Sequence, residues 1–213
     1  MRKRQLVVFG IVVCLASAEA AHAQPAAADE DDASIEYVRL GYTGIVSHEV
    51  HGAPGFAPLG FRHEYGRLAI DVSGFNLMAV SGSNGEQGQP AAWSLFKAEV
   101  LRFSNAESNR AFYAGGGVSY GGTFIESPYT GGALRSQTSW YGSGLQGEGS
   151  AGLEWGRMTH LREFLQIDVT LPFYQLRADV LDRRGAAVSV AHRYAPSVMV
   201  SYGLGWQHGH RRP

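Results

Sequence analysis

Apolar and polar side chains alternate along eight stretches of the chain, and segments rich in Gly, Pro and Ser separate many of them. In the first stretch, Leu40 and Tyr42 share one face, while Arg39 and Thr43 share the other. A period of two residues predicts β-strands, because the pattern of a helix would repeat every 3.6 residues. The stretches lie near residues 35–46, 58–65, 68–80, 92–103, 110–124, 142–156, 163–176 and 196–206.

The connections between these stretches are short at one end and long at the other. The short connections are 66–67, 104–109 and 157–162. The long connections are 47–57, 81–91, 125–141 and 177–195. The stretches have about the length of a tilted membrane strand, ~9–11 residues, and an even number of strands leaves both termini beside the short turns. The sequence therefore predicts an all-β fold, an eight-stranded antiparallel up-and-down transmembrane β-barrel.

Aromatic residues gather where the alternation starts and stops, and they predict two belts. Two belts are typical of a barrel that spans a membrane, because amphipathic rings prefer the level of the lipid head groups. At the end with the long loops, the predicted belt comprises Tyr42, Trp93, Phe124, Trp140, Tyr141, Phe173 and Tyr174. At the end with the short turns, it comprises Tyr65, Phe103, Phe112, Trp155, Phe164 and Trp206.

Residues 1–23 have the three parts of a secretory signal peptide. Arg2 to Arg4 supply the charged start, an apolar core too short to span a bilayer follows, and Ala21-His22-Ala23 fits the cleavage pattern. Ala18-Glu19-Ala20 is an alternative cleavage site. The rest of the chain is predicted to comprise a flexible acidic periplasmic segment at 24–34, the barrel at 35–206 and a periplasmic tail at 207–213.

Removal of this leader would change the composition in two ways. The only cysteine, Cys14, would be lost, so the mature chain would form no internal disulfide. The 18 basic and 19 acidic residues of the full chain would become 15 and 18, a formal charge of −3. This weakly acidic balance argues against nucleic acid as a partner, because nucleic-acid binding favours a concentrated basic face.

The stretches Val38-Arg39-Leu40-Gly41-Tyr42 and Val198 to Trp206 are the most typical of a known family. From residue 35 to residue 206 the chain resembles the small eight-stranded outer-membrane barrels, the group of the outer-membrane protein A transmembrane domain. The resemblance implies a location in the bacterial outer membrane, with outer-membrane lipid, lipopolysaccharide and the outer-membrane assembly machinery as partners. One departure is the end of the chain, because such barrels commonly finish on an aromatic residue, whereas here Gln-His-Gly-His-Arg-Arg-Pro follows Trp206.

The polar face of the predicted strands points into the barrel and carries charges of both signs. An eight-stranded barrel is only wide enough for its own side chains, so these charges are expected to pair or to bind water. We interpret them as a polar plug that fixes the register and closes the lumen, and an ion path or a proton-linked gate is the alternative. The surplus of acids predicts that some carboxyl groups are protonated or lie near the rims. The predicted network comprises Arg39, Arg62, Glu64, Asp71, Lys97, Glu99, Glu148, Glu154 and Asp168.

Two catalytic motifs match by pattern but lack the setting that they need. Gly117 to Gly121 fits G-x-S-x-G, and Asp168 and His192 follow in hydrolase order, but the motif lies within an alternating strand rather than at a strand-to-helix elbow. Gly142 to Gly147 fits G-x-G-x-x-G without a surrounding βαβ unit. The chain also contains two isolated histidine pairs, His48 with His51 and His208 with His210. Such pairs are more often solvated than metal-bound. No metal site and no cofactor are predicted.

The sequence leaves three functions open. The first is a non-enzymatic outer-membrane protein with a structural or surface-interaction role, whose long loops bind an unidentified extracellular ligand. The second is a hydrolase or transferase acting on acyl chains of lipid A or phospholipid, which would need a serine, a histidine and an acid near the outer rim. Its candidate residues are Ser47, His48, Glu49 and His51, or Ser189 with His192. The third is a narrow pore or a carrier of small apolar ligands. A soluble lipocalin-like barrel with an apolar lumen is the alternative architecture.

Overall fold

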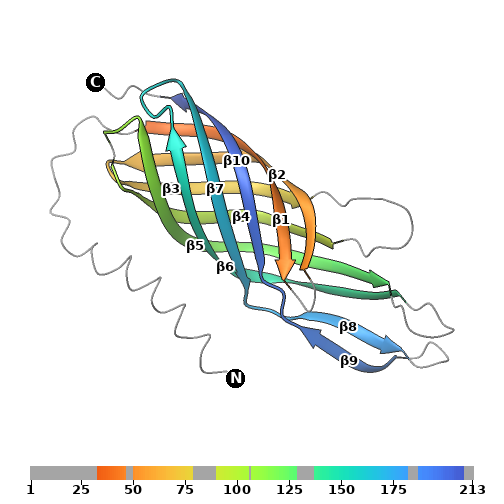
Figure 1. Ribbon diagram of the computed structural model, residues 1–213. Helices are drawn as coiled ribbons and strands as arrows, with labels where there is room; N and C mark the ends of the chain where they lie inside the picture. Colours follow the sequence, from red (N-terminus) through yellow and green to blue (C-terminus); the bar gives the residue numbers. More distant parts are fainter. Residues whose placement is uncertain are drawn as a thin grey trace, which may run out of the picture.

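Eight strands form a closed barrel in the computed structural model, and two further strands form a hairpin at one end (Figure 1). The strands are β1 (Ala33–Val46), β2 (Val50–Tyr65), β3 (Leu68–Met78), β4 (Pro90–Phe103), β5 (Arg110–Pro128), β6 (Gln137–Trp155), β7 (Leu161–Pro172), β8 (Leu176–Leu181), β9 (Ala187–Arg193) and β10 (Ser197–His208). The barrel strands follow the order β5-β4-β3-β2-β1-β10-β7-β6, and the pairing of β5 with β6 closes the ring. Because every pair is antiparallel, the predicted eight-stranded barrel is confirmed.

The described residues are 33–46, 50–78, 90–105, 107–128, 137–181 and 187–208. The predicted signal peptide, the acidic segment up to residue 32 and the tail after residue 208 lie outside these ranges, so they remain predictions. The described residues contain no helix that is both long and apolar enough to cross a membrane. The start of β1 and the end of β10 lie beside the short turns, at what we call the inner end, and the opposite end is the outer end (Figure 1).

Side chains along the barrel strands alternate between the lumen and the outer wall as the sequence predicts. On β7, for example, Gln166 and Asp168 are buried, while Leu165 and Ile167 are exposed on the wall. The same alternation continues around the ring, with buried polar residues inside and a band of exposed Leu, Ile, Val and Phe outside. A soluble lipocalin-like barrel would have the opposite arrangement, with its apolar residues in the lumen, so that alternative is wrong.

Two irregularities interrupt the regular ladder on the outer half of β3 and β4. Phe75 has a φ of 53°, which interrupts the alternation of β3 close to the Gly74-Phe75 step where the sequence pattern becomes unclear. On β4, the register with β5 shifts between Ser94 and Phe96, and both Leu95 and Phe96 are exposed. This bulge reverses the alternation, because one extra residue moves every later side chain to the other face.

The outer end contains more regular structure than the sequence predicts. The segment 177–195, expected to be a loop, contains most of the β8–β9 hairpin. Both β5 and β6 continue to 19 residues, so they extend into the predicted loop 125–141. The physical reason is burial, because Ile125 pairs with Trp140 across these two strands and both side chains are covered. The β8–β9 hairpin joins the sheet where Tyr141 pairs with Arg177.

Substitution of the outer wall by arginine is predicted to cost more in mid-strand than at the inner end. Ile167→Arg should destabilise the folded barrel in phospholipid vesicles by about 2–4 kcal/mol, and Phe112→Arg by about 0–1 kcal/mol, because the cost of a wall charge falls toward the interface. Urea titration of vesicle-inserted protein measures both values. Equal costs at the two positions would contradict a lipid-facing wall.

Candidate functional site

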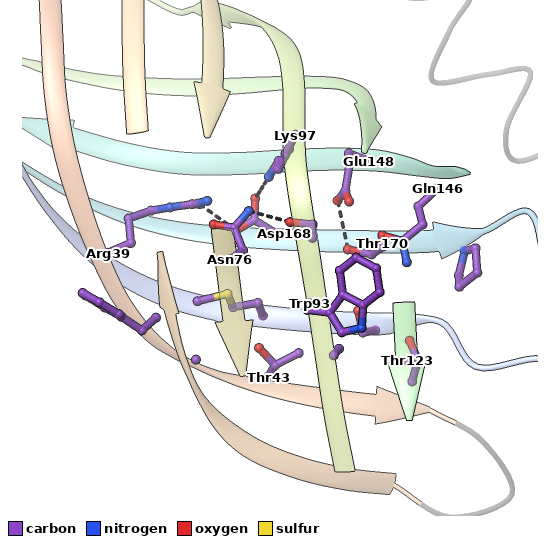
Figure 2. Close-up of a pocket in the computed structure, with 17 residues that line it drawn as sticks. Arg39, Thr43, Asn76, Trp93, Lys97, Thr123, Gln146, Glu148, Asp168 and Thr170 are labelled. Atoms are coloured by element: carbon purple, nitrogen blue, oxygen red, sulfur yellow. Dashed lines mark hydrogen bonds and ion pairs between the residues drawn. The ribbon is translucent and has the colours of Figure 1, made fainter. Parts of the chain in front are cut away.

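The middle of the lumen is occupied by an ion-pair layer that joins strands from opposite sides of the barrel. Lys97 of β4 donates from Nζ to Oδ1 of Asp168 on β7 at 2.5 Å, and Arg39 of β1 donates from Nη1 to Oδ2 of the same carboxylate at 2.9 Å (Figure 2). Lys97 also lies 2.9 Å from Oε2 of Glu99. Asp168 is thus held by two cations, and the four side chains are almost completely buried.

Neutral side chains complete the hydrogen bonding of this middle layer. Ser150 Oγ lies 2.7 Å from Glu99 Oε1 and 2.5 Å from Asp168 Oδ1. Gln166 donates from Nε2 to Asp168 at 2.6 Å, and Tyr113 donates its hydroxyl hydrogen to Gln166 Oε1 at 2.7 Å. A buried carboxylate needs several hydrogen-bond donors as well as a counter-charge, and these neutral groups supply them.

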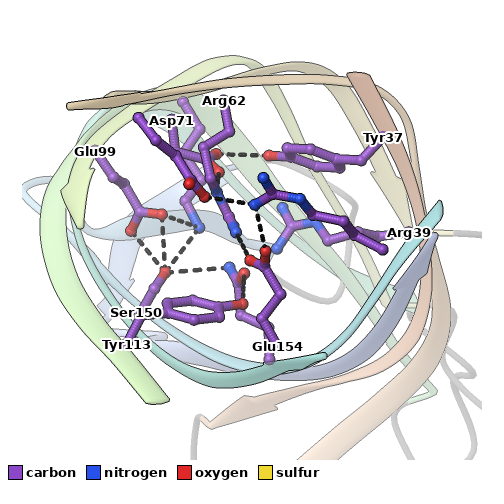
Figure 3. Close-up of polar contacts among 12 residues, drawn as sticks. Tyr37, Arg39, Arg62, Asp71, Glu99, Tyr113, Ser150 and Glu154 are labelled. Carbon is purple, nitrogen blue, oxygen red and sulfur yellow. Dashed lines mark hydrogen bonds and ion pairs between the residues drawn. The ribbon is translucent and has the colours of Figure 1, made fainter. Parts of the chain in front are cut away.

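Toward the inner end, Arg62 is the centre of a second layer (Figure 3). Its Nε donates to Asp71 Oδ2 at 2.7 Å, and its Nη1 donates to Glu154 Oε2 at 2.6 Å. The Tyr37 hydroxyl donates to the other oxygen of Asp71 at 2.5 Å. The guanidinium carbon also lies within 6 Å of the centroids of four rings, a geometry that favours cation–π attraction. The rings come from four different strands and belong to Tyr37, Phe103, Tyr113 and Phe164.

Two further arginines belong to this inner layer and were not among the predicted residues. Arg162 donates from Nη1 to Glu154 Oε1 at 2.7 Å and to Glu64 Oε1 at 2.8 Å. Arg157 donates from Nη2 to Glu64 Oε2 at 3.1 Å, and its guanidinium carbon lies 4.0 Å from the centroid of the Phe103 ring. The inner layer therefore holds three arginines and three carboxylates.

The two additional arginines change the charge balance that the sequence predicts. Of the nine predicted lumen charges, Glu148 is half-buried and the other eight are buried. With Arg157 and Arg162, the described part of the lumen holds five basic and six acidic groups, instead of the predicted three and six. The surplus of acids is therefore one group instead of three. The larger surplus, from which we predicted protonated or rim-located carboxyl groups, was wrong. Glu148, at the outer side, is the carboxylate for which no ion pair is formed among the described residues.

Some aromatic residues predicted for the belts lie inside the barrel instead. Phe103 is 1% exposed and packs in the inner layer, as does Phe164, while Trp140 is 9% exposed within an apolar cluster. Trp93 is half-buried and lines the lumen, as does Tyr174, whose hydroxyl accepts from Gln146 Nε2. Trp155 is half-buried and donates to Glu163. The remaining predicted belt residues are exposed, and they are Tyr42, Tyr65, Phe112, Phe124, Tyr141, Phe173 and Trp206.

The inner aromatic rings fit because glycines face them on the neighbouring strands. Gly60 pairs with Tyr37, and a Cβ atom on that glycine would collide with the tyrosine ring. Gly203 pairs with Phe164, and a Cβ atom there would collide with the phenylalanine ring. The glycine-rich strands of this barrel thus provide space for large side chains that cross the lumen.

A cavity of about 80 Å³, lined by charged, polar and apolar side chains, lies on the outer side of the middle layer (Figure 2). Glu148 faces it, with the Thr170 hydroxyl donating to Oε2 at 2.9 Å and the Ser119 hydroxyl 2.5 Å from Oε1. Two atoms of residues that line this cavity, Arg39 Nε and Asn76 Oδ1, are buried and have no protein hydrogen-bond partner in the described part of the chain. A cavity of this size and polarity is suited to ordered water, which would satisfy both atoms.

An apolar cluster lies beyond this cavity at the outer end. It joins side chains that belong to strands on opposite sides of the ring, Ile45 of β1 and Ile125 of β5. The guanidinium carbon of Arg193 lies 4.2 Å from the centroid of the Trp140 ring in the same cluster. The buried members are Ile45, Ile125, Trp140, Leu176, Ala178 and Ala195.

No protein-family model matches the sequence, and no curated protein matches it. Solved structures do share its architecture. The crystal structure of Neisserial surface protein A matches with a TM-score of 0.53 at 11% sequence identity, over 83% of this chain and 96% of that one. The crystal structure of Ail, the attachment invasion locus protein of Yersinia pestis, matches with a TM-score of 0.50 at 14% identity, over 84% of this chain and 100% of that one. This chain has the fold of the small eight-stranded outer-membrane barrels. The likeness is one of architecture, because the identities are low.

The residues suggested for catalysis are not brought together in the described structure. Ser119, from the G-x-S-x-G match, is buried in the lumen, where its hydroxyl contacts Gln146 and Glu148. Asp168 is bound by cations in the middle layer, and His192 is exposed on β9. Residues 47–49 and His210 lie outside the described residues, as do the side chains of His51 and Ser189. No group of three metal-ligating side chains occurs among the residues that are described.

Neutralising one carboxylate of the inner layer is predicted to destabilise the barrel strongly. Glu154→Gln keeps the size of the side chain but leaves Arg62 and Arg162 without a shared counter-charge, which should cost about 3–5 kcal/mol. Urea titration in vesicles measures the loss. The matched control is Glu163→Gln, which removes the same charge from the outer wall and should cost far less. An equally small loss for both variants would show that the lumen charges are solvated rather than paired.

Proposed function

We propose that this protein is a non-enzymatic barrel of the bacterial outer membrane with a closed lumen, and that it acts through a surface presented at its outer end. The observation that carries the proposal is the outer extension, formed by the outer parts of β5 and β6 with the β8–β9 hairpin. β5 and β6 are each 19 residues long, about twice the ~9–11 residues that a membrane crossing requires.

A location in the membrane is supported by the outer wall of the barrel. Its exposed apolar side chains occur on every barrel strand, whereas soluble monomers rarely expose a continuous apolar patch of this extent. The lumen, in turn, holds the buried charges and most of the buried polar side chains, which is the arrangement of transmembrane barrels. Lipid, with lipopolysaccharide in the outer leaflet, is therefore the expected surrounding of the wall.

A closed lumen is supported by the two ion-pair layers and the apolar cluster. Each layer connects side chains across the ring, and the largest buried ones, Arg62, Arg157 and Arg162, are in the inner layer. Moving them aside to admit ions would separate buried charge pairs, which is costly. Side chains of this size fill an eight-stranded barrel, which is only wide enough for its own interior residues.

The outer extension presents a row of exposed side chains that fits an anionic partner. The row crosses four strands, because Phe124 pairs with Tyr141, Tyr141 with Arg177, and Arg177 with His192. All four residues are exposed. Arginine binds anionic oxygens in a forked geometry, and exposed aromatic residues supply apolar contact area at binding surfaces. We infer that the extracellular ligand is a polyanionic surface, such as a sulfated or carboxylated polysaccharide.

Binding to immobilised heparin, used as a polyanionic probe, tests this role. The folded protein should bind, and Arg177→Ala combined with His192→Ala should weaken the affinity about tenfold or more, because hydrogen bonds to charged groups are lost. The matched control is Arg110→Ala combined with His160→Ala, which removes an arginine and a histidine from the inner end and should leave binding unchanged. Equal effects of the two pairs would contradict a binding surface on the extension.

Ion conductance in planar bilayers tests the closed lumen separately. The folded protein should produce no conductance steps, because an ion crossing the lumen would have to separate the buried charge pairs of the two layers. Insertion is verified in the same preparation by the shift in gel migration between unboiled and boiled samples. Steady ion-conducting steps from inserted protein would contradict the closed lumen and would support the narrow pore.

A further inference from the structure

The outer wall of the barrel contains a groove of about 400 Å³ over β1, β2 and β3. It lies where the β1–β2 register shifts between Tyr37 and Arg39, so Val38 has no directly opposed partner on β2. Gly74 of β3 leaves space beside it, because a Cβ atom at this position would meet only the Leu95 carbonyl oxygen, at 3.5 Å. Leu59 and Phe61 stand exposed along the groove. The bulge and the glycine thus create a depression bordered by apolar side chains, of a size typical of small-ligand sites.

The groove ends toward the inner end at an acidic side chain. Glu36 is part of the lining, and its side chain is 68% exposed on the wall. It lies between two aromatic residues in one cross-strand row, because it pairs with Trp206 on β10 and with Phe61 on β2. A carboxylate flanked by two aromatic side chains is a setting that favours an ammonium group, through charge attraction and cation–π contact.

Hydrogen-bonding groups follow in the next row toward the inner end. His208 Nε2 lies 3.6 Å from the Glu36 carboxylate, and its side chain is also well exposed. The Ser34 hydroxyl and the His63 Nδ1 atom lie 2.7 Å apart on the neighbouring strands. Imidazole and hydroxyl groups donate hydrogen bonds to phosphate oxygens. An apolar groove, a carboxylate and phosphate-binding donors therefore follow one another along the wall.

We propose that this groove binds one phospholipid of the inner leaflet whose head group carries an ammonium ion, of the phosphatidylethanolamine class. One acyl chain lies in the groove along Val38 and Gly74. The ammonium contacts Glu36 between Trp206 and Phe61, and the phosphate accepts hydrogen bonds from His208 and His63. The proposal rests on the membrane location proposed above, and it adds a specific ligand on the wall.

The chemistry of the head group distinguishes this lipid from others. Lipid tails are as apolar as the groove, so burying a chain gives little selectivity. The selectivity comes from Glu36, which attracts an ammonium and repels a head group whose only charge is negative. Lipopolysaccharide belongs to the opposite leaflet, whereas Glu36 is the fourth residue from the inner end of β1 (Ala33–Val46).

Native mass spectrometry of the detergent-folded barrel tests the proposal with two lipids of identical acyl chains. With phosphatidylethanolamine and phosphatidylglycerol at equal concentration, one phosphatidylethanolamine should remain bound, with a preference of about tenfold. Glu36→Gln should abolish the preference, whereas Glu163→Gln, which removes a wall carboxylate outside the groove, should not.

A second pair of variants tests the groove itself. Gly74→Leu fills the depression and should reduce retention of both lipids about tenfold. Gly149→Leu is the control, because it adds the same side chain to β6, where nothing lies within 4 Å of its Cβ position.

Equal retention of the two lipids by the wild-type protein would by itself overturn the proposal. The gel-migration shift and vesicle insertion, measured in parallel, report the membrane location independently, so an inserted barrel without lipid preference would refute only the lipid site.

Discussion

The pairing of buried charges across a narrow lumen is the constraint on which the rest of this structure depends. A guanidinium or carboxylate that is fully buried inside an eight-stranded barrel has little water to solvate it, so it must face an opposite charge held in register by the strands. Arg62 shows this directly, because it joins Asp71 on β3 to Glu154 on β6. A shift of either strand by one residue would turn that carboxylate toward the wall. The ion pairs therefore favour one register of the sheet.

In the function that we propose, the same constraint places the functional surfaces on the outside of the barrel. A lumen filled by paired side chains offers little room to a substrate, while the wall and the outer extension present different surfaces. On the wall, a bulge beside Val38 creates a groove in the apolar band. At the outer end, an apolar cluster around Trp140 supports strands that continue beyond the barrel. The two proposed roles, lipid contact and surface recognition, thus fall on separate parts of one scaffold.

The alternation of apolar and polar residues predicted the barrel and the residues that face the lumen, because this two-residue pattern can be read even where the ends of a strand are uncertain. It also contained signals that we did not use. Phe103 and Trp140 are in step with the lumen-facing residues of their strands, yet their position near the strand ends suggested aromatic belts instead. Arg162 is four residues before Gln166, so the two-residue alternation also places it on the lumen face. Arg157 could not be placed in this way, because it lies in a turn after Gly156, whose φ of 78° reverses the chain and ends the alternation. The β8–β9 hairpin could not be predicted from the sequence either, because its stability depends on contacts with β6.

Solid-state NMR of the barrel in lipid bilayers tests the central account most directly, because it observes the ion pairs themselves. With ¹⁵N-labelled arginine and ¹³C-labelled carboxylates, the Arg62 guanidinium should show dipolar contacts to Asp71 and Glu154, and its protons should exchange slowly with D₂O. Single substitutions of the two carboxylates would assign the contacts. Rapid exchange and the absence of these contacts in inserted protein would reveal a hydrated, open lumen and would contradict the account.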